Sequence, residues 1–361
     1  MHRLTFLKRN WKLLLNLTTL VVLAILLYAI RGQIFATFDN LHKVNLWVIA
    51  LMVPIQIVNY HAQTKMYQGL FAVVGNKLRY WPVWRVALEL NFVNHVFPSG
   101  GVSGISYFGI RLRRADITGA KSTLVQVMKL VIYFAAFEML LVAGVFFMAL
   151  GGRVNNLVML TVGSLSTLLI VGTFAFLYII GSERRIHVSF LAITKFLNDA
   201  LRFLKLRGKR DVFNPERAES AVKEFHHNYK VIKANYRKLK GVLWWALIAN
   251  ATEIMSIYVV YIAFGKWVNV GSMILAYGVA NFAGLVSVMP GGIGIYEALM
   301  TGVLAAAGIP AALSLPVTVM YRVFNTIIQL PLGYAFYHQS LNNMNKPEDM
   351  HVEFIGNRHE Q

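Results

Sequence analysis

The chain has 361 residues, of which 57% are hydrophobic and 14% charged, and its formal net charge is +19. This composition indicates a protein with several membrane-spanning helices. The absence of cysteine excludes disulfides and thiolate chemistry. The basic residues concentrate in short segments between apolar ones, and no base-reading module is present, so the charge indicates membrane orientation and excludes a nucleic-acid partner.

Six apolar segments approach or exceed the roughly 20 residues that a helix needs to cross the hydrocarbon core. They are residues 11–30, 44–61, 121–150, 157–180, 242–264 and 311–337. No small-residue cleavage site follows the basic N-terminus, so we expect the first segment to be a retained span rather than a signal peptide.

Two further hydrophobic segments carry the same helix breaker. Asn91-Phe92 precedes Phe97-Pro98-Ser99-Gly100-Gly101, and Asn281-Phe282 precedes Met289-Pro290-Gly291-Gly292-Ile293. Backbone polar groups in lipid need partners inside the protein, so such breaks occur where they are buried or line a cavity. Paired breaks in corresponding halves of a chain point to a transport site near the membrane midplane.

The two halves also match each other beyond the breakers. A shift of 192 residues (290 − 98) superimposes Pro98 on Pro290 and several small or apolar positions, such as Met128 on Met320. Aliphatic matches alone can arise by chance between two membrane helices. The shared proline, double glycine and Asn-Phe dipeptide favour an internal repeat.

We therefore predict an all-α polytopic membrane protein with six full spans and two re-entrant helix pairs, at residues 82–110 and 270–307. The placement of basic residues puts both termini in the cytoplasm, and the two pairs then enter from opposite sides as an inverted repeat. Eight full spans are the alternative.

The prediction divides the chain into four parts. These are an N-terminal membrane half (1–181), a basic cytoplasmic connector (182–240), a C-terminal membrane half (241–340) and a polar tail (341–361). Apolar residues recur at helical spacing among basic ones in the connector, which is typical of an amphipathic helix on an anionic leaflet surface. An ordinary cytoplasmic connector is the alternative.

Polar residues form one face in each of two spans. Ser122, Gln126, Lys129 and Tyr133 share a helix face, and Thr318, Arg322, Asn325 and Gln329 repeat that spacing. An ionisable residue in a span costs at least about 2.5–3.5 kcal/mol on insertion scales, so it normally faces the protein interior. We predict that Lys129 and Arg322 hold a substrate phosphate, with Gln126 and Asn325 beside them.

The alternative is that these cations neutralise buried carboxylates. Candidate partners are Glu89, Glu138, Glu253 and Glu297. Glu253 and Glu297 are also candidates for the substrate site, and either could carry a proton.

The breakers themselves supply a second component of the predicted site. After Pro98 and Pro290 the chain can restart as a helix, whose N-terminus carries about half a positive charge and favours anions. Gly100, Gly101, Gly291 and Gly292 permit close backbone approach to a ligand. The plainer interpretation is that these glycines pack helices tightly.

The breaker motifs also carry a resemblance to a known family. Phe97-Pro98-Ser99-Gly100-Gly101 and Met289-Pro290-Gly291-Gly292-Ile293-Gly294-Ile295-Tyr296-Glu297 resemble the lysylphosphatidylglycerol synthase transmembrane-domain family. That family includes the membrane half of the bacterial multiple peptide resistance factor and a set of stand-alone proteins. The resemblance covers nearly the whole chain and implies lipid translocation. Because the chain ends at Gln361, without room for an aminoacyl-transferase domain, we expect a stand-alone member that does not synthesise lipid.

The expected function is a flippase or transporter for a phospholipid or a lipid-linked phosphate carrier in the bacterial inner membrane. No catalytic motif is present in the sequence, so we expect no enzymatic activity, cofactor or metal. Expected partners are the lipid, with an anionic or zwitterionic headgroup, the anionic leaflet surface and a second copy of the chain. The alternatives are a non-catalytic partner of a lipid-dependent glycosyltransferase and a membrane enzyme that modifies lipid.

Overall fold

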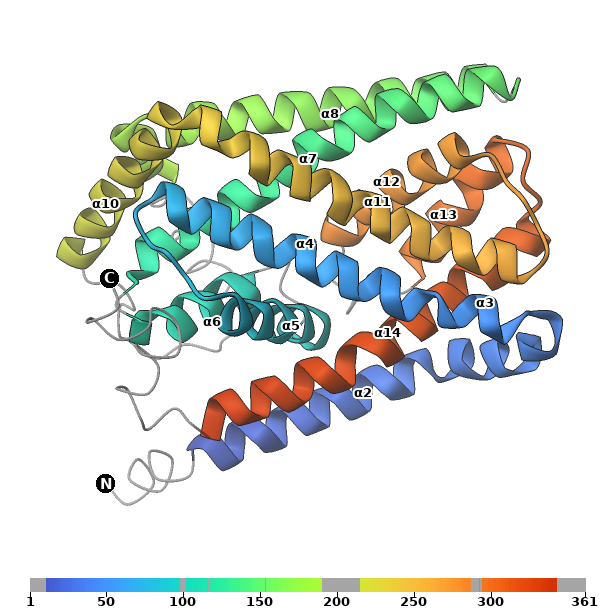
Figure 1. Ribbon diagram of the computed structural model, residues 1–361, viewed down its shortest axis with the longest axis horizontal. Coiled ribbons are helices and arrows are strands. Elements are labelled where there is room, and N and C mark those ends of the chain that lie inside the picture. Colours follow the sequence, from blue (N-terminus) through green and yellow to red (C-terminus); the bar gives the residue numbers. More distant parts are fainter. Residues whose placement is uncertain are drawn as a thin grey trace, which may run out of the picture.

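A computed structural model describes residues 11–97, 102–115, 117–152, 154–189, 215–286, 292 and 294–342. Within these ranges all regular elements are helices. Figure 1 shows the long helices running roughly side by side along the long axis of the molecule. The predicted all-α polytopic class is therefore confirmed.

Five stretches of the described chain are helical, long and apolar enough to cross a membrane. They are Leu46–Val73, formed by α3 (Leu46–Ala50) and α4 (Met52–Val73); α7 (Gly119–Leu150); α8 (Asn156–Ile180); Tyr236–Ala263, formed mainly by α11 (Leu239–Ala263); and α14 (Ala311–Asn342). The first predicted span falls within α2 (Trp11–Asn40), a 30-residue helix that lies along α14 in Figure 1.

The two predicted re-entrant segments are pairs of shorter helices. The first pair is α5 (Tyr80–Val96) with α6 (Val102–Leu112), and the second is α12 (Val270–Val286) with α13 (Ile295–Ala306). Their lengths of 17, 11, 17 and 12 residues fall below the roughly 20 residues of a full span, which favours re-entrant pairs over eight spans.

The two pairs lie at opposite ends of the bundle. In Figure 1 the first pair lies toward the end that carries both chain termini and α10 (Pro215–Ala234), and the second pair lies toward the other end. This arrangement is the one that an inverted repeat requires, although the symmetry relation itself stays a prediction.

The helix boundaries agree with an internal repeat. A shift of 190 residues (270 − 80) carries both ends of α5 onto both ends of α12, and a shift of 192 residues (311 − 119) does the same for α7 and α14. The two halves therefore differ by a two-residue insertion in the segment that contains the second breaker and α13.

Small residues let α12 approach α7 closely. A Cβ atom at Gly271 would collide with the backbone carbonyl of Gly144, and one at Gly278 would collide with the ring of Phe137. Membrane helices have no hydrophobic driving force between them, so such close backbone contact supplies much of their packing energy.

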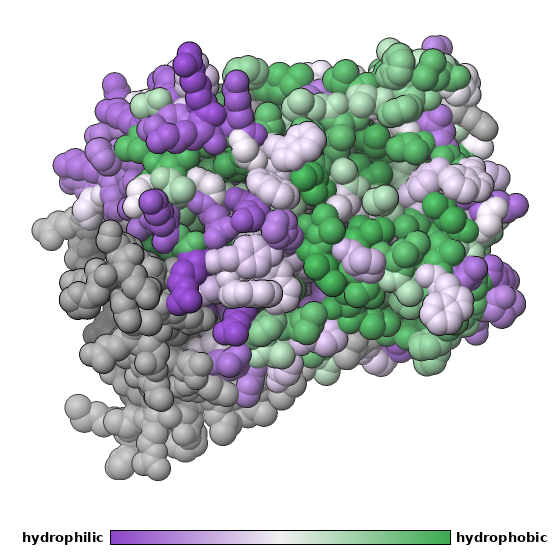
Figure 2. All heavy atoms as spheres, in the orientation of Figure 1, coloured by the Kyte–Doolittle hydropathy of each residue, from purple (hydrophilic) through white to green (hydrophobic). Residues whose placement is uncertain are grey.

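The outer surface matches a membrane environment. On the face drawn in Figure 2, hydrophobic residues cover the middle and right of the molecule, whereas hydrophilic ones gather at the left end, near α10, and at the right edge. Large apolar side chains such as Phe146, Leu160 and Phe174 are exposed on α7 and α8, as expected for helices that face lipid.

Single-cysteine accessibility should place the two ends on opposite sides of the membrane. The α7–α8 and α11–α12 connections lie at the end opposite to the C-terminal end of α6. We expect cysteine at Val154 or Lys266 to react with an impermeant reagent added outside intact cells, and cysteine at Arg113 to react only after permeabilisation. Labelling of Arg113→Cys in intact cells would contradict re-entry of the first pair.

Candidate functional site

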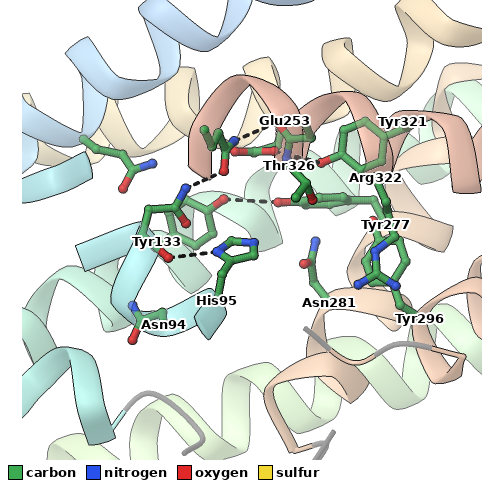
Figure 3. Close-up of a pocket in the computed structure, with 14 residues that line it drawn as sticks. Asn94, His95, Tyr133, Glu253, Tyr277, Asn281, Tyr296, Tyr321, Arg322 and Thr326 are labelled. Carbon is green, nitrogen blue, oxygen red and sulfur yellow. Dashed lines mark hydrogen bonds between the residues drawn. The ribbon is translucent and has the colours of Figure 1, made fainter. Parts of the chain in front are cut away.

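A cavity of about 350 Å³ lies between the two broken helix pairs, in the centre of the bundle (Figure 3). Helices α4, α5, α7, α11, α12, α13 and α14 all contribute side chains to it. Every lining residue that the structure describes carries a polar group: Gln63, Asn91, Asn94, His95, Tyr133, Glu253, Tyr277, Asn281, Tyr296, Tyr321, Arg322, Asn325, Thr326 and Gln329. Polar groups inside a membrane protein are costly, so their concentration here indicates function.

The asparagine before each breaker reaches this cavity. Asn91 donates hydrogen bonds to the Tyr60 hydroxyl and to Gln329, thereby joining α5 to α4 and α14. The Nδ2 atom of Asn281 is buried and has no hydrogen-bond partner among the described residues. Figure 3 shows Asn281 and His95 between the tyrosines that surround the cavity. From the sequence, both asparagines were identified only as positions shared by the two repeats, and it was not predicted that they line the cavity.

Arg322 faces the cavity as predicted, but it also has a carboxylate partner. Its Nη1 atom forms an ion pair with Oε1 of Glu297, and its guanidinium lies 5.0 Å from the ring centroid of Tyr296. Glu297 is 5% exposed. In this conformation Arg322 therefore neutralises a buried glutamate, which was the alternative role considered for it.

Glu297 is fixed in place by further contacts. Its Oε1 atom accepts a hydrogen bond of 2.8 Å from Gln33 of α2, and its Oε2 atom accepts one of 2.6 Å from the backbone N–H of Gly294. The second contact caps the start of α13 and requires the chain to turn at Gly294, whose φ is 85°. Glu297 therefore joins three helices.

Lys129 faces a second cavity of about 320 Å³ that adjoins the first. The two cavities share Gln63, Asn91, Asn94 and Tyr133. The Lys129 Nζ atom donates hydrogen bonds to Gln63 (2.9 Å) and to the Tyr67 hydroxyl (3.1 Å). It also lies 4.3 Å from the centroid of the Tyr67 ring. No described carboxylate forms a salt bridge with Lys129, so its partners among the described residues are neutral groups.

The other predicted site residues extend these two networks. Gln126 lines the Lys129 cavity and accepts a hydrogen bond of 2.9 Å from the Tyr67 hydroxyl. Asn325 lines the central cavity and accepts one of 2.7 Å from Gln329. Glu253 also lines the central cavity, where Tyr321 donates a hydrogen bond of 3.0 Å to its Oε2 atom.

The anion site predicted at the breakers is only partly within the described chain. Pro98, Gly100, Gly101, Pro290 and Gly291 lie outside the described residues, so their contribution stays a prediction. Gly292 is described and has a φ of 64°, a conformation that favours glycine.

A bundle of apolar helices of membrane length, with a polar cavity at its centre, defines a multi-pass membrane protein. The chain belongs to the family described as the lysylphosphatidylglycerol synthase TM region, whose model matches residues 15–333. The family predicted from the breaker motifs is thereby confirmed.

Curated relatives include two archaeal proteins described as UPF0104 membrane proteins. The one from Methanothermobacter thermautotrophicus is 27% identical over 103 residues, which cover 28% of this chain and 31% of the relative. The one from Pyrococcus horikoshii is 25% identical over 118 residues, which cover 33% of this chain and 35% of the relative. The matches thus span about a third of each relative's length.

Proposed function

We propose that the protein moves a membrane lipid, either a phospholipid or a lipid-linked phosphate carrier, between the two leaflets. The observation that carries this proposal is the polar cavity between the two broken helix pairs. A headgroup that crosses the bilayer needs polar partners at the midplane, and binding sites of transporters lie between broken helices at that depth.

The two cations have different parts in this proposal. Arg322 is already paired with Glu297, whereas the partners of Lys129 among the described residues are neutral hydrogen-bond acceptors and an aromatic ring. A phosphate that enters the cavity beside Lys129 gains a charge-assisted hydrogen bond without displacing a carboxylate. Of the two cations, Lys129 is therefore the favoured phosphate ligand.

The remaining features of the proposal concern the membrane and its surfaces. We place the protein in the bacterial plasma membrane, with both termini and α10 on the cytoplasmic side, and assign it no catalytic role. The described part of the connector, α10, carries an exposed ion pair of 2.7 Å between Lys223 and Glu219, as expected for a solvated helix. We further propose that an amphipathic segment of the connector contacts anionic lipid. We also propose that a second copy of the chain is a partner.

Leaflet-resolved lipid movement in proteoliposomes tests the proposal directly. The full chain should accelerate the movement of fluorescent phosphatidylglycerol or phosphatidylethanolamine above the rate in protein-free vesicles. Lys129→Gln should slow this movement about 10- to 100-fold, the equivalent of one charge-assisted hydrogen bond. Lys121→Gln is the matched control, because Lys121 lies on the same helix but donates to Asn76 outside both cavities.

Two outcomes would contradict this assignment. Equal rates with and without protein would overturn lipid movement and would favour the non-catalytic partner of a glycosyltransferase. Unchanged movement in Lys129→Gln would show that this cation does not bind the headgroup.

A further inference from the structure

Two glutamates, Glu297 and Glu253, lie beside the central cavity, and their surroundings differ. Both oxygens of the Glu297 carboxylate are engaged, by Arg322 and Gln33 on one side and by the backbone of Gly294 on the other. Its partners are thus a cation and N–H donors from other parts of the chain, and Glu297 links the start of α13 to α2 and α14.

Glu253 lacks such a set of partners. Among the described residues its hydrogen-bond donor is the Tyr321 hydroxyl, at 3.0 Å from Oε2, and no described group hydrogen-bonds to Oε1. No described cation forms a salt bridge with it. The side chain is half-buried in α11, a helix long enough to cross the membrane, and it lines the cavity.

The titratable groups around Glu253 come from all sides of the cavity. The hydroxyls that interact with its charge belong to Tyr60, Tyr133, Tyr277, Tyr296 and Tyr321, on α4, α7, α12, α13 and α14. On α5, His95 lines the same cavity and is bonded at Nδ1 to the Asn91 carbonyl, and on α14 Arg322 is committed to Glu297. Hydroxyls can serve an anionic or a neutral carboxyl equally well, because each is both a donor and an acceptor.

We propose that Glu253 is a proton-binding site that couples lipid movement to a proton gradient. This inference rests on the proposed function, since it names the energy source of the same cavity. Water in the cavity would deliver the proton to the carboxylate, which becomes neutral without losing the Tyr321 contact. A carboxyl group that gains or loses its charge in the membrane interior changes the relative energies of conformations that place it in different surroundings, and so can drive movement between them.

The position of Glu253 explains how its charge could reach both helix pairs. Tyr277 and Tyr296 belong to the two helices of the second pair, and the Tyr277 hydroxyl lies 3.2 Å from that of Tyr133 on α7. Tyr133 in turn lines both cavities. Glu253 thus shares the central cavity with His95 of the first pair and with both helices of the second, and the Tyr277–Tyr133 contact leads toward the Lys129 cavity.

The coupling can be measured in proteoliposomes whose membrane potential is clamped with potassium and valinomycin. Vesicles of phosphatidylethanolamine and phosphatidylglycerol would carry fluorescent phosphatidylglycerol as the probe. If one proton moves with each lipid, a gradient of one pH unit should produce a steady-state leaflet ratio of about tenfold, and reversal of the gradient should reverse the ratio. In Glu253→Gln the ratio should fall to about one in either gradient.

An infrared measurement tests the assignment of the proton site even if Glu253→Gln moves no lipid, because it does not depend on transport. Infrared difference spectra of the purified protein should contain the C=O band of a carboxylic acid that appears on acidification, and Glu253→Gln should abolish this band. Glu138→Gln is the comparison variant: Glu138 in α7 lines neither cavity, but its buried Oε2 atom has no hydrogen-bond partner among the described residues, so it is the rival source of the band, and the band should persist in this variant. Persistence of the band in Glu253→Gln would overturn the assignment.

The outcomes separate this inference from the proposed function. If the wild-type chain moves lipid but ignores the pH gradient, or responds to a sodium gradient instead, the proton site is wrong and lipid movement stands. If it moves no lipid above the protein-free rate while the Glu253 band titrates, lipid movement is wrong and the proton site stands.

Discussion

Replacement of Arg322 by Gln should lower the free energy of unfolding by about 3–5 kcal/mol, because it leaves the buried Glu297 carboxylate without its cation. The measurement is equilibrium unfolding of the purified protein in mixed micelles of dodecyl maltoside and sodium dodecyl sulfate. From the sequence, this role of Arg322 was only the alternative to phosphate binding.

The matched double variant identifies the cause. Glu297→Gln in the Arg322→Gln background removes the unpaired charge and keeps one oxygen acceptor, which can serve either Gln33 or the N–H of Gly294. We expect it to recover most of the lost stability. A double variant as unstable as Arg322→Gln would show that the guanidinium acts through other contacts, such as the ring of Tyr296.

The parts of the fold that were predictable from the sequence are those set by local composition. Runs of apolar residues mark the long helices, and a proline with two glycines marks each break, because the cost of unpaired backbone groups in lipid depends on the chain segment alone. The inward direction of Lys129 and Arg322 follows from the cost of an exposed charge in lipid. Each of these predictions uses only the residues within a single helix.

The side-chain partners could not be predicted in the same way. Arg322 meets Glu297 across 25 residues of chain that include the end of α13, and Lys129 meets Gln63 across 66 residues. These pairings depend on how helices pack, which helical periodicity does not specify. One signal was available: α4 carries Gln56, Asn59 and Gln63 within an apolar span, and such residues normally face other helices.

A second ion pair, between Arg111 of α6 and Glu89 of α5, offers a test of the first broken pair. The Arg111 Nε atom lies 3.1 Å from Glu89 Oε2, and the two side chains are 5% and 1% exposed. The Tyr107 hydroxyl donates a hydrogen bond of 2.7 Å to the same oxygen and lies 3.3 Å from the hydroxyl of Ser340 on α14. This network holds the two helices of the pair to each other and to the bundle.

We expect Arg111→Met to lower the free energy of unfolding by about 3–5 kcal/mol, since methionine preserves the volume but removes the cation beside the buried Glu89 carboxylate. Arg85→Met is the control: Arg85 lies one helical turn from Glu89 on α5 but is exposed, with its guanidinium 5.6 Å from the ring centroid of Phe336, so its loss should lower stability by no more than about 1 kcal/mol. Adding Glu89→Gln to Arg111→Met should restore stability. Equal losses in Arg85→Met and Arg111→Met would mean that net charge at this end of the bundle, rather than the buried pair, holds α6 against α5.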